Sequence, residues 1–163
     1  MNAATDQHSL RHQALRHLGG LAHQTRASLR AADRFVTQGS SPDAETANWL
    51  VSTAVDLARE VAEELDNLAR SLRESGADAA RLQALAPWRR TAHQLHAACR
   101  AADVFLEQDS NDDQDTGTWL VASARGLADR LAAALDDGVG AWAASVSAEP
   151  VRRVAAPQRS AAG

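Results

Sequence analysis

Histidine, arginine and aspartate recur together in this chain, and their types and spacing could do chemistry. The set occurs twice at the same spacing, as His23, Arg30 and Asp33 and again as His93, Arg100 and Asp103. Carried on one helix, such a set could bind a phosphate group or act in acid–base chemistry. The Arg-x-x-Asp spacing also fits an ion pair within a single helix, and we expect that pair to form in both copies.

A metal site is a second role for histidines. His96 follows His93 by three residues, so the two could share a helix face. Helical bundles that hold a di-iron centre use Glu-x-x-His pairs on facing helices, and this chain contains no such pair. The single cysteine, Cys99, excludes an internal disulfide framework and a cysteine-based zinc site. We therefore expect neither a metal nor a cofactor, and we assign no catalytic residue.

Two tryptophans are candidate binding residues. Trp49 and Trp119 each lie in the segment Thr-x-x-Trp-Leu-Val, close to an expected turn between helices. Because aromatic residues near helix turns usually pack, we expect each indole to close the end of a helical hairpin against Phe35 or Phe105. The alternative is an exposed aromatic anchor for a partner protein.

Another pattern resembles a family of nucleases. Arg11 precedes His17, and Arg90 precedes His96, at the Arg-x(4–6)-His spacing of HEPN-type helical RNases. The resemblance covers these few residues. It implies a nucleic-acid-processing activity based on histidine and arginine as an alternative function.

The composition favours helices. Of the 163 residues, 37 are alanine, all seventeen basic residues are arginine, and there are nine glycines and four prolines. Alanine, leucine, arginine and glutamate form helices well, whereas the β-branched and aromatic residues typical of strands are scarce. The class is therefore all-α, and the length suits one domain.

The chain carries no segment typical of membrane targeting. Its first ten residues are polar, and no run approaches the ~18 apolar residues of a membrane span. We expect a cytoplasmic protein that does not enter a membrane.

An internal repeat of seventy residues is the strongest pattern in the sequence. Residues 11–72 align with residues 81–142 without a gap, and 26 of the 62 pairs are identical. Chance would give roughly one identity in ten for this composition. We therefore expect two tandem helical hairpins, over about 8–76 and 78–142, within one domain of residues 1–144.

Apolar residues at steps of three and four predict two helices in each repeat. We expect the helices near residues 8–37, 44–74, 79–107 and 114–137, with the last able to extend to Trp142. Together they should form an antiparallel four-helix bundle.

Local signals mark the helix ends and predict a bend. Ser-x-x-Asp, beginning at Ser40 and again at Ser110, is typical of a helix start, and Gly76 is suited to end the helix before it. Gly19-Gly20 and Pro87 lie at matching depth in the first helix of each repeat. Because both disfavour a regular helix, we expect a kink or short break there.

Charge is sorted by helix. The net charges are +3 for residues 1–37, −6 for 38–69, +2 for 70–107 and −5 for 108–137. The first helix of each repeat is therefore basic and the second is acidic. We expect antiparallel neighbours to present complementary faces, and the alternative is a polarised surface for charged partners. Residues 145–163 should form a disordered tail rich in alanine and arginine.

These features favour a non-enzymatic protein-interaction or regulatory module with charge-sorted faces. Its partner would be another protein or a second copy of the chain in a homodimer. The candidate binding residues are the two tryptophans, the two His-Arg-Asp sets and His96. Two alternatives stay open: the HEPN-like function, with nucleic acid as a less favoured partner, and small-molecule binding between the hairpins, where Trp88 and Cys99 would line the core.

Overall fold

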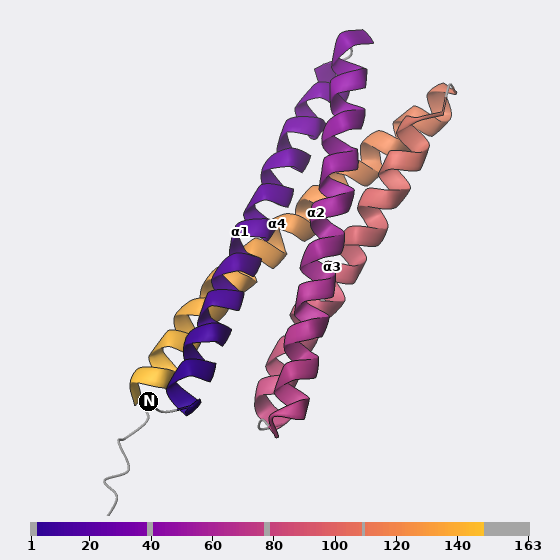
Figure 1. Ribbon diagram of the computed structural model, residues 1–163. Helices are drawn as coiled ribbons and strands as arrows, with labels where there is room; N and C mark the ends of the chain where they lie inside the picture. Colours follow the sequence, from indigo (N-terminus) through magenta and orange to yellow (C-terminus); the bar gives the residue numbers. More distant parts are fainter. Residues whose placement is uncertain (1–2, 39–40, 77–78, 109, 149–163) are drawn as a thin grey trace, which may run out of the picture.

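The computed structural model describes residues 3–38, 41–76, 79–108 and 110–148, and these form four helices joined by short connections. The helices are α1 (Ala3–Gln38), α2 (Ser41–Glu74), α3 (Ala79–Leu106) and α4 (Asn111–Ala148). No strand occurs in the described ranges. Consecutive helices run in opposite directions (Figure 1). The all-α class and the packing of four helices are confirmed.

Each helix packs along two others. The basic helices α1 and α3 both contact the acidic helices α2 and α4, so like-charged helices lie diagonally across the bundle. In Figure 1, α4 passes behind the other helices, from beside α3 at one end to beside α1 at the other. Every extensive helix interface therefore joins a basic helix to an acidic one.

The core consists mostly of leucine and alanine on the stripes that the sequence predicts. One cluster runs along most of the bundle and includes Leu15, Leu29, Leu65 and Leu135, all essentially inaccessible to solvent. A smaller cluster lies toward the end that carries the α1–α2 and α3–α4 connections, and its members are Ala32, Val51, Ala102 and Val121. Small side chains let the helix axes approach closely, although each alanine buries less apolar area than a leucine.

The helix ends follow the local signals. Gly76 has a φ of +66°, and its N–H donates to the carbonyl of Arg73 at 3.0 Å just after the end of α2. Before α4, the Ser110 hydroxyl accepts a hydrogen bond from the backbone N–H of Asp113 at 3.1 Å and donates to its carboxylate at 2.6 Å. Both predictions are confirmed. The matching cap at Ser40 lies outside the described residues.

The helix-disfavouring residues lie inside continuous helices. Gly19-Gly20 falls within α1, and Pro87 falls within α3. Neither helix is interrupted at these positions, and a bend there stays a prediction. The hydroxyl of Thr91 donates to the Pro87 carbonyl at 3.0 Å.

Helix α4 is longer than the sequence indicates. It continues past residue 137 to Ala148, so the first four residues of the expected tail, 145–148, are helical. The rest of that tail, 149–163, lies outside the described residues. None of the helices in the described ranges is long and apolar enough to cross a membrane.

Trp88 packs against a glycine on the neighbouring helix. A Cβ atom added to Gly138 would lie 2.1 Å from the indole ring. Seventy residues earlier, the two positions hold Leu18 and Leu68, both buried in the core. The pair of Trp88 and Gly138 in the second repeat thus takes the place of two leucines in the first.

The same exchange occurs near the start of α4. A Cβ atom on Gly117 would lie 2.8 Å from the side chain of Leu106. The positions seventy residues earlier hold Ala47 and Val36. A larger side chain on α3 is again matched by a smaller one on α4, as close packing requires.

Two glycine variants separate helix propensity from packing. Gly20 is exposed with nothing within 4 Å of an added Cβ, so Gly20→Ala should raise the unfolding free energy by about 0.5–1 kcal/mol. Gly138→Ala gains the same propensity but drives a methyl group into Trp88, and we expect a net loss of about 1–3 kcal/mol. Urea denaturation measures both changes.

A double variant provides the control for Gly138. Trp88→Leu combined with Gly138→Leu recreates the Leu18 and Leu68 combination and should recover most of the lost stability. Equal stabilisation by Gly20→Ala and Gly138→Ala would contradict the packing argument.

Candidate functional site

Trp49 and Trp119 lie on the outer surfaces of α2 and α4, where each residue is 68 % exposed. The residues two positions before and two positions after each tryptophan are buried; they are Ala47 and Val51, and Gly117 and Val121. Two residues span about 200° of helix, so each tryptophan faces away from the core. The prediction that the indoles pack against Phe35 or Phe105 is therefore wrong, because the phase of the buried stripe decides their direction.

The two tryptophans have matching surroundings. Each has an exposed acidic residue four positions earlier and an exposed threonine three positions earlier; these are Glu45 and Thr46, and Asp115 and Thr116. The hydroxyl of Thr53 or Ser123, four positions later, donates to the tryptophan carbonyl at 2.9 or 3.0 Å. Each indole thus lies one helical turn from a carboxylate on an acidic helix.

His23 and His93 each contact an aspartate on an adjacent acidic helix. His23 Nε2 lies 3.0 Å from Asp136 Oδ1 on α4, and His93 Nε2 lies 3.2 Å from Asp66 Oδ2 on α2. The two histidines are seventy residues apart, and so are the two aspartates. Equivalent residues therefore make the same contact at two helix interfaces. The contacts lie at different helix interfaces, and the structure does not bring the two histidines together.

His96 lies on α3 among positive charges. Its pKa is lowered from the ordinary 6.5 because the ring is partly buried and because Arg100, Arg59 and His93 lie nearby. The uncharged ring is therefore the main form at neutral pH. Among the described side chains, no aspartate forms a hydrogen bond with it.

Arg30 and Asp33 find their partners on α4. Arg30 Nη2 donates to Asp129 Oδ1 at 2.8 Å, and Arg125 Nη1 donates to Asp33 Oδ2. The predicted Arg30–Asp33 pair within α1 is therefore wrong. The packing of α1 on α4 brings in partners from about a hundred residues away, which local spacing does not reveal.

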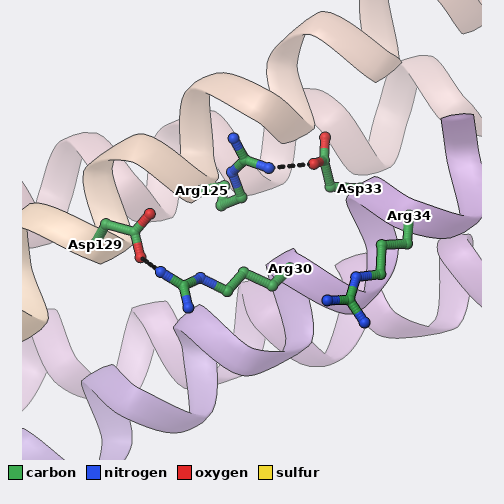
Figure 2. Close-up of a pocket in the computed structure, with 5 residues that line it drawn as sticks. All are labelled: Arg30, Asp33, Arg34, Arg125 and Asp129. Atoms are coloured by element: carbon green, nitrogen blue, oxygen red, sulfur yellow. Dashed lines mark hydrogen bonds and ion pairs between the residues drawn. The ribbon is translucent and has the colours of Figure 1, made fainter.

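These four side chains and Arg34 line a hollow of about 300 Å³ between α1 and α4. Figure 2 shows the two ion pairs side by side, with the guanidinium of Arg34 in neither. Three arginines and two aspartates give the hollow one net positive charge. Guanidinium groups held in place in this way can bind an anion.

The second copy of the set, Arg100 and Asp103, has different surroundings. The α4 residues Arg125 and Asp129 correspond to Val55 and Arg59 on α2. Asp103 therefore faces Val55 where Asp33 has Arg125, and Arg100 faces Arg59 where Arg30 has Asp129. The guanidinium of Arg59 instead contacts Asp56 of its own helix at 3.0 Å.

The charged form of Asp103 is consequently disfavoured in the folded chain. Burial raises its pKa, and the negative charges of Glu107 and Asp56 raise it further. Among the described ion pairs none joins Asp103 to Arg100, so the predicted pair within α3 does not form either.

Asp66 holds two partners from α3. Arg89 donates to Asp66 Oδ1 from Nε at 2.7 Å and approaches it with Nη2 at 2.6 Å, while His93 contacts Oδ2. Burial raises the pKa of Asp66, but Arg89 and His93 outweigh this, and the net pKa is lowered. Sequence reasoning missed this residue. Its identity with Asp136 in the other copy is the signal that could have found it.

The remaining candidate chemistry is limited. Cys99 is buried, and burial raises the pKa of its thiol to about 12, so the nucleophilic thiolate is not populated at neutral pH. Within the described residues, no group of three or more histidine, cysteine, aspartate or glutamate side chains could hold a metal ion.

The HEPN-like residues of the first copy turn toward α2. Arg11 Nη2 donates to Ser75 Oγ at 2.7 Å, and His17 Nε2 lies 3.9 Å from Glu60 Oε1. Arg90 and His96, the second match, lie on α3.

Comparison with protein-family models, with curated protein sequences and with solved structures finds no match to this chain.

The two aspartates with shifted pKa values predict opposite effects of neutralisation. Because the pKa of Asp66 is lowered on folding, its charge stabilises the fold, and Asp66→Asn should cost up to about 1 kcal/mol at pH 7. That cost should shrink only as the pH falls below 3.8, the ordinary value, and through the lower folded pKa. Urea denaturation across pH measures it.

Asp103→Asn is the matched variant. Because its pKa is raised on folding, the charged form is disfavoured, and neutralisation should stabilise the fold at pH 7. The gain should fall as the pH drops through the raised folded pKa and should be gone below 3.8. Loss of stability in both variants at pH 7 would show that Asp103 is not under repulsion.

Proposed function

We propose that this chain is a non-enzymatic protein-interaction module that binds a partner through Trp49 and Trp119. The proposal is carried by one observation, the equal 68 % exposure of the two tryptophans. A single exposed apolar residue is ordinary on a protein surface. Two tryptophans at equivalent positions, each with the same acidic and hydroxyl neighbours, form a repeated surface feature. Tryptophan is also enriched among the residues that contribute most to protein interfaces.

The charge around the indoles supports a basic partner. The segments 38–69 and 108–137, which include the tryptophans, carry net charges of −6 and −5. Glu45 and Asp115 each lie one helical turn from an indole. An arginine or lysine beside an apolar pocket would match the indole face and the carboxylate together. The partner is either another protein or a second copy of this chain, whose helices α1 and α3 are basic.

The position of the indoles supports two separate contacts. α2 and α4 lie diagonally in the bundle, and each indole faces away from the core. Trp49 and Trp119 are therefore on opposite sides of the molecule. A module with this geometry joins two partner surfaces, which suits a scaffold or a regulator.

We also propose that the bundle is one domain of two tandem hairpins, α1–α2 and α3–α4, that arose by duplication. The identity of 26 of the 62 residue pairs that lie seventy positions apart and the repeated His–Asp contact support this origin. Bends in α1 near Gly19-Gly20 and in α3 near Pro87 belong to the same proposal, because glycine and proline both weaken a helix locally. A cytoplasmic location stays a prediction.

The alternative functions have less support. A nucleic-acid-processing site would need the histidines together, and His23 and His93 lie at separate interfaces. A small-molecule site in the core would need space beside Trp88 and Cys99. Trp88 packs on Gly138 instead, and Cys99 is fully buried in the core cluster.

Replacing both tryptophans tests the interaction. Trp49→Ala with Trp119→Ala should weaken partner binding or self-association by about 30-fold or more, the effect of losing a hot-spot residue. Stability should change by no more than about 0.5 kcal/mol, because both side chains are exposed. Sedimentation at several protein concentrations measures self-association, and affinity capture from source cells at two salt concentrations measures other partners.

Two exposed apolar residues elsewhere provide the control. Leu10→Ala with Val104→Ala removes side chains that are 65 % and 54 % exposed. This variant should keep the partner and the oligomeric state of the native chain. If the tryptophan variant also keeps both, the indoles are not the binding surface.

A further inference from the structure

The hollow between α1 and α4 combines two arginines held in ion pairs with a third that has no such pair among the described residues. Asp129 holds Arg30, and Asp33 holds Arg125. A guanidinium has five N–H donors, so each pair leaves donors for another acceptor. The guanidinium of Arg34 has no hydrogen bond or ion pair among the described residues, and Figure 2 shows it at the same hollow.

The charges of the hollow favour an anion. Each carboxylate faces an arginine, which offsets its charge, and the third arginine leaves an excess of one positive charge. The fixed carboxylates also restrict the rotation of Arg30 and Arg125, so less side-chain freedom is lost when a ligand binds. The hollow is thus partly organised before any ligand arrives.

This combination occurs at one interface and is not repeated at the other. The position equivalent to Arg34 holds Val104, and the position equivalent to Arg125 holds Val55. Arg34 is exposed, and it makes no hydrogen bond or ion pair among the described residues. It adds a third arginine beside the two ion pairs, at a position where the other copy has the uncharged Val104.

We propose that this hollow binds the phosphate group of a small phosphorylated molecule. A phosphate offers three or four oxygens to three guanidinium groups, whereas a carboxylate offers two. The volume of about 300 Å³ lies at the lower end of the range for small-ligand sites. The lining residues include neither tryptophan and none of the acidic and hydroxyl neighbours described for Trp49 and Trp119; Arg125 and Asp129 lie further along α4.

Titration with inorganic pyrophosphate tests the site in the full-length chain. Two-dimensional NMR of the arginine Nε–Hε groups follows binding at constant ionic strength, so that general screening does not change. Signals of Arg30, Arg34 and Arg125 should shift together and saturate. Arg34→Gln should weaken binding by about 10-fold or more, as expected for a lost hydrogen bond between charged groups.

Arg90→Gln is the matched control, because Arg90 is an exposed arginine on α3 that does not line the hollow. It should bind pyrophosphate as the native chain does, and both variants should keep the native circular dichroism spectrum. Equal weakening by the two substitutions would mean diffuse attraction and would overturn the proposal. It would equally fail if acetate bound as tightly as pyrophosphate, or if a ten-nucleotide thymidine oligomer bound at these arginines while pyrophosphate did not.

Discussion

Two aspartates seventy residues apart, Asp66 and Asp136, tie the acidic helices to the basic ones. Each contacts a histidine across a helix interface, at 3.2 Å and 3.0 Å. A partly exposed polar contact adds only about 0–1 kcal/mol of stability, but its geometry requires one alignment of the two helices. These contacts therefore favour one alignment of α1 with α4 and one of α2 with α3.

The two copies agree in the core and differ at the interfaces. Where core residues differ, a larger side chain on one helix is matched by a smaller one on its neighbour, as Trp88 is by Gly138, so the packing stays close. The interface charges differ without such compensation, since α1 and α4 share two Arg–Asp pairs while Asp103 on α3 has no arginine partner among the described ion pairs. Core positions tolerate little because a change of one methylene group is felt. Exposed charges are less constrained, because a substitution there usually changes stability by no more than about 0.5 kcal/mol.

Local features of the sequence were sufficient to predict the elements. The three-four stripe, the glycine at position 76 and the cap at Ser110 act within one or two helical turns, and each is present as expected. The direction of Trp49 also follows from local phase, because Ala47 and Val51 on either side belong to the buried stripe. The position of Trp49 relative to the buried stripe predicts its exposure better than its nearness to the turn between helices does. The length of α4 was underestimated because alanine and glycine beyond residue 137 give a weak pattern.

The sequence by itself determined an all-helical chain, its internal repeat and the alternation of basic and acidic helices, since composition and periodicity are properties of the chain alone. Only the tertiary structure decided which charges meet. Arg30 is three residues from Asp33, yet it binds Asp129, because the packing of α1 on α4 places that carboxylate 2.8 Å from the guanidinium. Partners a hundred residues apart depend on the relative position of two helices. That position is set by the whole bundle and is not encoded in any one segment.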